Sequence, residues 1–210
     1  MMRGTGRETS AGLAAGHPAI ATSQGLTWLW QHLQEVRHPY ILDCGAISPA
    51  TLKVLMERKA KLFVADLLSV SLDGEAKLWD RNQKVAVFKT SEFISYLPDV
   101  PTGSLSAILS WNLLDLLPEA ARLAVMDKLF SFLQPLGVIF SFLREPSQKL
   151  GVGRRWWLES QNQVRMDQDE KRAFPYPPVS NRGIEKLVPG GNVKIFLTRS
   201  GRREVLSIKG

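Results

Sequence analysis

The chain has 210 residues, of which 44% are hydrophobic and 22% charged, a composition typical of one globular domain with short extra segments at its ends. Lys and Arg exceed Asp and Glu by 27 to 20, and no stretch approaches the roughly 20 apolar residues of a membrane span. With one cysteine, Cys44, an internal disulfide is excluded, and three histidines give no recognisable zinc site, so we expect a cytoplasmic protein with no metal and no membrane contact.

The first 24 residues are rich in Gly, Ala, Ser and Thr and show no sustained period. We expect a disordered leader there, followed by a single domain over residues 25–210. Four apolar residues then fall at helical spacing: Leu26, Leu29, Trp30 and Leu33. This spacing predicts an amphipathic helix that ends near Arg37, before His38 and Pro39.

Apolar runs alternate with helical patterns through the middle of the chain. Residues 39–45 and 60–68 are predicted strands, joined by a helix over 48–59 with Ser48 as its N-cap and Pro49 in its first turn. Further strands are predicted at 84–90, 105–114 and 136–145, and a helix at 118–134. Continuous apolar runs are typical of strands buried on both faces. The sequence therefore predicts an α/β fold, a Rossmann-like and mainly parallel sheet with helices on both faces.

The last third of the chain changes character. Residues 148–180 are polar with interspersed aromatics and predict a loop, within which 151–181 is the expected lid or substrate loop. Its conspicuous side chains are Arg154, Arg155, Trp156, Trp157, Phe174 and Tyr176. They suit either a lid over a substrate pocket or apolar anchors of the loop. A short helix over 180–190 and a C-terminal antiparallel β-hairpin over 192–210 complete the prediction.

Acidic residues end the first two predicted strands. Asp43 is followed by Gly45, and Asp66 comes 23 residues after Asp43. In Rossmann-type sites a glycine turn after the first strand approaches the ligand, and a carboxylate after the second accepts hydrogen bonds from ribose hydroxyls. The spacing therefore predicts a nucleoside ligand. Each carboxylate also has a structural alternative: Asp43 bonding the amides of its own turn, and Asp66 capping the segment that follows.

These residues and the order of elements resemble class I S-adenosylmethionine-dependent methyltransferases over roughly residues 26–210. Asp43 and Gly45 stand where the Asp-x-Gly-x-Gly-x-Gly motif of that family begins, and Asp66 matches its acidic residue after the second strand. The closing hairpin resembles its sixth and seventh strands. Ile47 and Pro49 replace the second and third glycines, and the Ile47 side chain would narrow the space where the backbone usually lies close to the methionine part of the cofactor.

The resemblance implies S-adenosylmethionine as cofactor and adds candidate site residues. The segment after the 84–90 strand takes the place of adenine contacts, with Glu92 as polar candidate and Phe93 as an apolar wall. At the end of the fourth strand, Trp111 would line the pocket and Asn112 would present an amide to cofactor or substrate. Asp115 is the nearest carboxylate that could act as a base. Phe93 as core and Asp115 as an exposed helix-start residue are the structural alternatives.

The resemblance implies a methyltransferase that acts on an unidentified small or medium-sized acceptor, catalysing mostly by alignment. The alternative is a catalytically inactive methyltransferase-fold module that binds a protein or nucleic acid through a basic C-terminal face, because residues 182–210 hold seven Lys or Arg against two Glu. Nucleic acid is not favoured, since stacking aromatics are not interleaved with these charges. An open space beside Gly45 and Asp66 favours the enzyme, whereas a space filled by Ile47 favours the inactive module. A third hypothesis is a nicotinamide-dependent oxidoreductase, which uses the same first two strands. The final hairpin and the lost glycine pattern make it less favoured.

Overall fold

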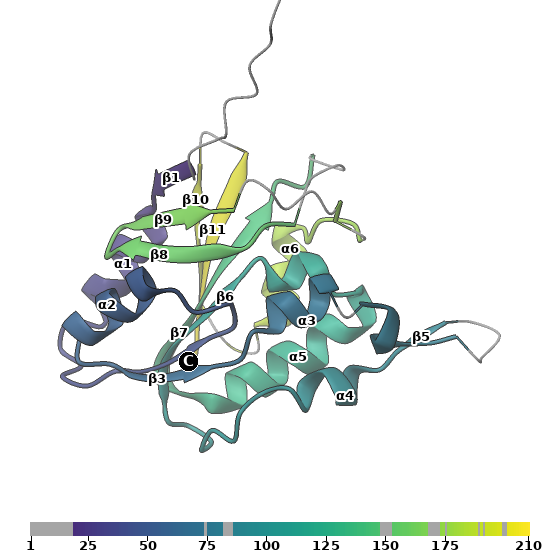
Figure 1. Cartoon of the computed structure of the whole chain (residues 1–210), viewed down its shortest axis with the longest axis horizontal. Coiled ribbons are helices and arrows are strands. Elements are labelled where there is room, and N and C mark those ends of the chain that lie inside the picture. Colours follow the sequence, from purple (N-terminus) through teal and green to yellow (C-terminus); the bar gives the residue numbers. More distant parts are fainter. Residues whose placement is uncertain are drawn as a thin grey trace, which may run out of the picture.

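The computed structural model describes residues 19–73, 75–81, 86–147, 153–167, 173–174, 176–188, 190, 192–198 and 201–210. A six-stranded sheet of order β10-β11-β7-β6-β2-β3 runs through its centre (Figure 1). The strands are β2 (Tyr40–Asp43), β3 (Lys61–Val64), β6 (Leu105–Trp111), β7 (Leu133–Arg144), β10 (Asn192–Leu197) and β11 (Arg202–Ile208). β3, β2, β6 and β7 run parallel to one another, and β11 is antiparallel to β7 and β10. The predicted Rossmann-like sheet with its C-terminal hairpin is confirmed.

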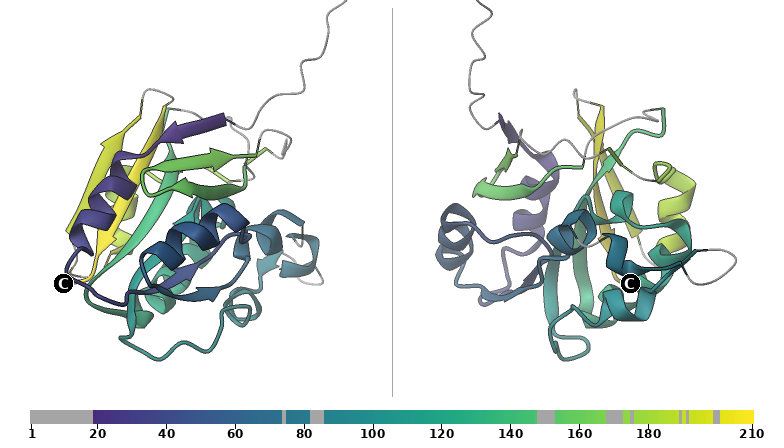
Figure 2. Two further views of the ribbon diagram at one scale, coloured as in Figure 1. Left: turned by 60° about the vertical axis from the view of Figure 1, so that its left-hand side comes forward. Right: turned by 45° about the vertical axis from the view of Figure 1, so that its right-hand side comes forward.

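Helices cover both faces of this sheet. They are α1 (Gln24–His32), α2 (Pro49–Glu57), α3 (Leu67–Asp73), α4 (Thr90–Ile94), α5 (Glu119–Phe132) and α6 (Asn181–Leu187), with 3-10 turns η1 (Glu75–Leu78) and η2 (Leu113–Leu116). Figure 2 shows α1 and α2 on one side of the sheet and α5 and α6 on the other. All seven residues of β6 are buried, as expected for a central strand between two helical layers. Within the described ranges, no helix is long and apolar enough to cross a bilayer.

Local sequence explains where the first two helices begin. Ser48 caps α2 by accepting a hydrogen bond from Thr51 N (3.1 Å), with Pro49 in the first turn as predicted. Ser23 caps α1 in the same way, and Glu204 of β11 accepts hydrogen bonds from Ser23 Oγ and Gly25 N. A carboxylate at a helix N-terminus satisfies free N–H groups and complements the helix dipole. The start of α1 is therefore fastened to the last strand of the sheet.

A second sheet replaces part of the predicted leader and part of the predicted loop. β8 (Trp156–Ser160) and β9 (Gln163–Met166) form an antiparallel hairpin, to which β1 (Ala19–Thr22) adds a third strand. The prediction of a leader through residue 24 is thus wrong from Ala19 onward, and residues 1–18 lie outside the described part. The loop prediction failed because a strand period is hidden among polar residues: Trp156, Leu158 and Val164 are buried, whereas their neighbours are half-buried.

The strand predicted at 84–90 does not join the central sheet. Only Val87–Phe88 (β5) is a strand there, and it pairs with β4 (Trp79–Asp80) in a separate two-stranded sheet; residues 82–85 lie outside the described part. Aromatic contacts stabilise the β4–β5 sheet: the Phe88 ring packs edge-on against Trp79 and at a tilt against Phe93 of α4. As a result β3 has β2 as its only strand neighbour among the described residues.

Candidate functional site

The turn after β2 is closed by a buried carboxylate. Asp43 is 1% exposed, and its Oδ1 accepts hydrogen bonds from Gly45 N (2.9 Å) and from Trp111 Nε1 (2.7 Å). Burial raises the pKa of Asp43 to about 7; the bonds from Trp111 and Gly45 oppose this rise, and the charge of nearby Asp66 adds to it. The structural alternative for Asp43 is therefore realised, because its carboxylate bonds the amide of its own turn.

Trp111 occupies the space beside Gly45. A Cβ atom at Gly45 would lie 2.9 Å from both Cδ1 and Nε1 of the Trp111 indole, so only glycine fits there. Ile47, which the sequence singled out as the obstacle, is 38% exposed, and the atoms nearest to this Cβ position belong to Trp111 and Asp43. Trp111 is fully buried and has a φ of 52°, a left-handed conformation that is uncommon for a bulky residue. The space is filled, but by a residue 66 positions further along the chain.

An aromatic column holds Trp111 in place. Its indole stacks on Phe142 of β7 with ring centroids 6.2 Å apart, and Phe142 stacks on Trp156 of β8 at 4.4 Å. The guanidinium of Arg202 lies 4.7 Å from the Trp156 ring on the column's outer end. Stacked aromatic pairs contribute roughly 0.5–1.5 kcal/mol each beyond the area that they bury. The column therefore ties the end of β6 to the β8–β9 hairpin.

Two polar contacts fix the hairpin above the strand ends. Thr51 Oγ1 in the first turn of α2 accepts from Leu158 N (3.1 Å) and donates to Leu158 O (3.4 Å). The Asn112 side-chain amide meets the backbone of Arg154; in the orientation that satisfies both groups its N donates to Arg154 O (3.1 Å) and its O accepts from Arg154 N (3.3 Å). Asn112 thus fastens the chain's own backbone, and the part of the expected lid at 156–166 is a β-hairpin docked on α2.

Asp66 lies where β3 meets α3. Its Oδ1 accepts from Ser69 N (3.0 Å), which realises the capping alternative, and its side chain is half-buried. Parallel strands place their carboxyl ends at one edge of a sheet, where open α/β folds bind ligands. The structure brings Asp43, Gly45, Asp66, Trp111 and Asn112 to this edge from β2, β3 and β6.

Two other predicted residues lie elsewhere. Phe93 is fully buried against Phe88, as the core alternative stated, and Glu92 is exposed and pairs with Lys89 at 3.4 Å. Figure 1 shows their helix, α4, beside α5 on the far side of α3 from the β8–β9 hairpin. The structure therefore does not bring Glu92 or Phe93 to the group around Asp43.

Asp115 belongs to a buried arginine cluster. Its Oδ2 accepts from Arg144 N (2.8 Å) and lies 3.6 Å from Arg144 Nε, so the expected exposed position at a helix start is wrong. Burial raises the pKa of Asp115, and the charges of Arg144, Arg122 and Arg203 oppose that rise. The arginines in turn donate to the backbone carbonyls of Tyr176, Pro177 and Val179. This cluster fastens the segment before α6 to the sheet, a role that sequence spacing gave no signal for.

The basic C-terminal face expected from the charge count does not form as such. Arg203 is fully buried, Arg202 lies over Trp156, and the Lys209 ammonium donates to the carbonyls of Phe130 (3.0 Å) and Leu133 (2.7 Å). Side chains of adjacent residues on a strand point to opposite faces, so a run of charges in sequence is divided between interior and surface. Arg182 and Lys186 on α6 and Lys194 on β10 remain exposed, so the described residues form only part of the surface on which the inactive-module alternative depended.

The edge fits one half of S-adenosylmethionine and not the other. The half-buried Asp66 carboxylate at the end of the second parallel strand suits ribose hydroxyls, which donate to carboxylate oxygens. The turn at Gly45, where the resemblance places the methionine part, is in contact with the Trp111 indole instead. The carboxylate at this edge thus suits the ribose by its chemistry, whereas the turn at Gly45 is filled by the Trp111 indole.

Comparisons with known proteins match the fold. No protein-family model matches the sequence, and no curated protein matches it. A structure from Sulfolobus solfataricus, assigned as a type 11 methyltransferase, superposes with a TM-score of 0.50 at 15% identity over 90% of this chain and 95% of that one.

Two further structures are more distant. A SAM-dependent methyltransferase from Aquifex aeolicus gives a TM-score of 0.48 at 14% identity over 90% of this chain and 91% of that one. The 1,6-didemethyltoxoflavin-N1-methyltransferase of Burkholderia thailandensis, solved with S-adenosylhomocysteine, gives 0.46 at 15% identity over 88% and 76%. Together with the strand order and closing hairpin, the Sulfolobus likeness identifies the fold of this chain as that of the class I SAM-dependent methyltransferases.

Proposed function

We propose that this chain is a SAM-dependent methyltransferase acting on a small or medium-sized acceptor. One observation carries the proposal: a methyltransferase fold brings a half-buried carboxylate, Asp66, and a buried one, Asp43, to the carboxyl ends of adjacent parallel strands. That edge is where open α/β sheets bind nucleoside ligands. The cofactor supplies a methyl group on a cationic sulfur, and the Asp66 carboxylate favours a cation by its charge.

Asp66 is the proposed ribose-binding residue. Its Oδ1 is engaged by Ser69 N, so the carboxylate keeps hydrogen-bonding capacity for a hydroxyl while it caps α3. Asp43 holds the turn through Gly45 N and fixes Trp111 at the far side of the same edge. Asp115 is not proposed as a base, because it is buried within the arginine cluster.

Binding of the whole cofactor requires Trp111 to leave the space beside Gly45. The left-handed backbone of Trp111 favours such a change, since residues held in sparsely populated conformations store roughly 1–3 kcal/mol and concentrate at functional sites. The hydrogen bond to Asp43 and the stacking on Phe142 oppose the movement. The proposal therefore predicts that binding alters the surroundings of the Trp111 indole.

The test is isothermal titration of the purified chain with S-adenosylmethionine and S-adenosylhomocysteine. We expect binding by the unaltered chain, loss of binding in Asp66→Ala, and unchanged binding in the matched control Glu92→Ala on α4. Asp66→Asn separates the two roles of Asp66, since asparagine also caps helices but carries no charge. No heat and no thermal shift with either ligand would refute the proposal, as would equal binding by Asp66→Ala.

A further inference from the structure

The outer edge of β3 carries free backbone hydrogen-bonding groups. Lys61 N donates to Pro39 O and Ala65 N donates to Asp43 O, so the residues of β3 that face β2 are Lys61, Phe63 and Ala65. Because successive residues of a strand direct their N–H and C=O groups to opposite sides, those of Leu62 and Val64 face away from β2. Among the described strands none lies on that side. An edge of this kind is a template for pairing with another strand.

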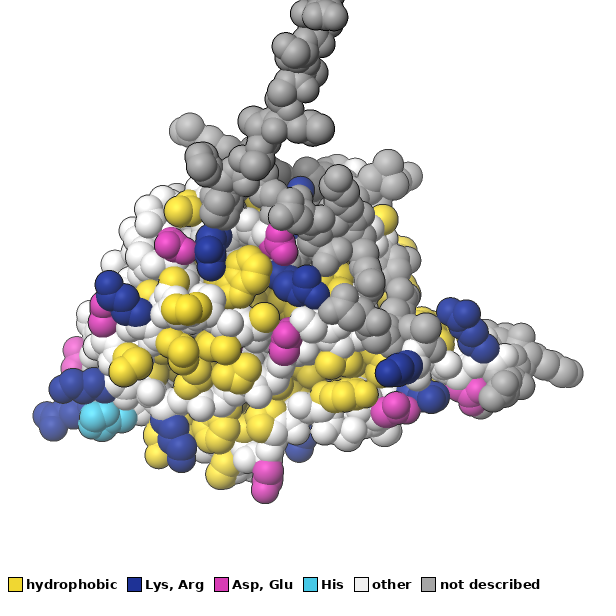
Figure 3. Space-filling view, in the orientation of Figure 1, with side chains coloured by type: hydrophobic (Ala, Val, Ile, Leu, Met, Phe, Trp, Pro, Cys, Tyr) yellow, Lys and Arg dark blue, Asp and Glu magenta, His cyan; other side chains and the backbone are white. Residues whose placement is uncertain are grey.

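Apolar side chains surround this edge. Val64 is 42% exposed, and α2 presents Leu52 at 41% and Met56 at 73% on one helical stripe. Figure 3 shows hydrophobic side chains gathered over α2 and β3 on this face of the molecule. Contiguous exposed apolar surface beside polar residues is typical of protein interfaces. The neighbouring α2 can thus add packing to any strand that pairs with β3.

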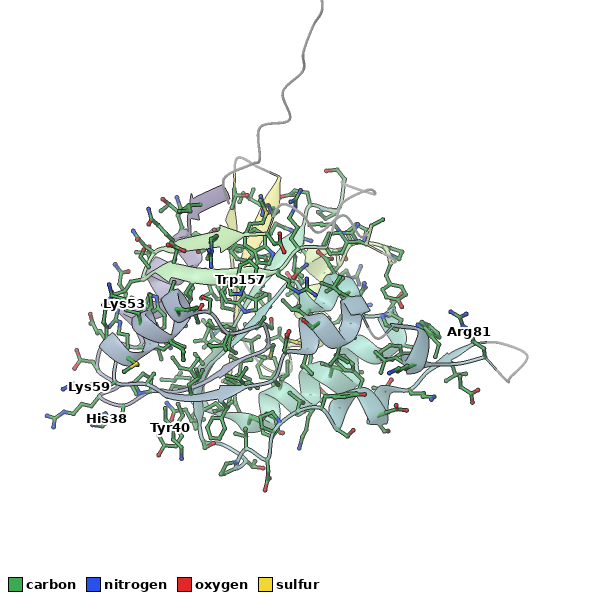
Figure 4. The ribbon with its side chains drawn as sticks, viewed as in Figure 1. His38, Tyr40, Lys53, Lys59, Arg81 and Trp157 are labelled. Carbon is green, nitrogen blue, oxygen red and sulfur yellow. The ribbon has the colours of Figure 1, made fainter. Side chains whose placement is uncertain are left out.

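Charges differ between the two ends of β3. Lys59 and Lys61 lie at its start and are exposed, whereas Asp66 follows its end. In Figure 4, Lys59 and His38 lie close together at the left of the molecule, near the start of β3. Trp157 of β8 lies well away from them. Antiparallel pairing of two identical strands sets the start of one against the end of the other. A second copy of β3 therefore meets the basic end of this strand with its acidic end.

We propose that two copies of this chain form a dimer by antiparallel pairing of their β3 strands about a two-fold axis at Phe63. Among the registers that set outward-facing groups opposite each other, the one with Leu62 opposite Val64 of the second copy pairs both outward-facing residues of β3. That register sets Lys61 opposite Ala65 of the second copy, beside its Asp66, and keeps the lysines of the two copies apart. The interface is isologous, so it uses the β3 edge of both copies and closes at two chains.

The register explains why a dimer is favoured over open-ended aggregation. Phe63 lies opposite Phe63 of the second copy across the axis. Aromatic cross-strand pairs stabilise antiparallel strands by roughly 0.2–1 kcal/mol. Lys61 Nζ lies 4.8 Å from the Tyr40 ring and 5.5 Å from the Phe63 ring, so its stem already covers that face of the edge. A lysine on a short edge discourages pairing with unrelated strands, whereas the acidic end of a second copy accommodates it.

Sedimentation velocity over a concentration series tests the proposal. We expect a species of twice the chain mass of 23.5 kDa. Val64→Pro removes an outward-facing N–H that β2 does not use, so the fold persists and the dimer is lost. Leu52→Glu places a charge in the apolar surface and also gives monomer. The matched control is Leu123→Glu on α5, where Leu123 is 50% exposed, and this variant stays dimeric.

Circular dichroism of each variant shows whether the chain remains folded. A monomeric unaltered chain at every concentration would overturn the proposal. A dimer that survives both Val64→Pro and Leu52→Glu in folded protein would also overturn it. So would a dimer that only Leu123→Glu disrupts, because in both cases the contact between the copies does not lie at β3.

Discussion

Asp43→Asn should stabilise the protein above neutral pH. The side chain is 1% exposed, and burial raises the pKa of the carboxyl from 3.8 to about 7. Both hydrogen bonds that it receives, from Gly45 N and Trp111 Nε1, reach the same oxygen, Oδ1, and an asparagine oxygen can accept both. The substitution thus removes the buried charge and retains the geometry of the turn.

The sign and the size follow from the pKa. Because the folded-state pKa lies above the unfolded value, the folded chain holds this proton more tightly, and the stability gained is fully present below pH 3.8 and lost as pH rises through about 7. A rise of about three pKa units corresponds to about 4 kcal/mol at about 1.36 kcal/mol per unit. The opposing effect of the two hydrogen bonds is already contained in this pKa, so we expect the substitution to gain about 2–4 kcal/mol above pH 7.

Urea unfolding followed by far-ultraviolet circular dichroism measures the difference between Asp43→Asn and the unaltered chain across this pH range. The difference should grow from near zero at the acidic end to its full value above pH 7. Trp111→Phe should have the opposite effect. It removes the hydrogen bond from the indole to Asp43, which stabilises the charged carboxylate, so it should lower the free energy of unfolding more above pH 7 than below it. A difference that stays constant with pH would refute the reasoning.

Three further predictions concern the same edge. Gly45→Ala should lower the free energy of unfolding by about 1–3 kcal/mol in urea titrations, because the new Cβ meets the Trp111 indole at 2.9 Å. Thr51→Val should speed hydrogen exchange at the Leu158 amide, since that amide loses its acceptor. Cys44 is fully buried with a raised thiol pKa, so a thiol reagent should modify it only at the rate of unfolding; faster modification would contradict this burial.

The sequence predicted features that depend on residues close along the chain. The strand at Tyr40–Asp43, the helix capped by Ser48 and opened by Pro49, and the closing hairpin are all observed near their expected bounds. Each rests on a local property: an apolar run, a cap and a fixed proline φ, or a turn between two strands. Alternation of these elements was enough to indicate a parallel sheet and hence the edge at which Asp43, Asp66 and Asn112 meet.

Long-range contacts decided how that edge is used. The hydrogen bond from Trp111 to Asp43 spans 68 residues, and those between Thr51 and Leu158 span 107. Asp115 is buried because arginines from three other segments converge on it, and no spacing along the chain encodes that meeting. Residue types and their spacing determine local conformational preference. The side chain that fills the space beside Gly45 is decided instead by packing between elements that come together only in the folded chain.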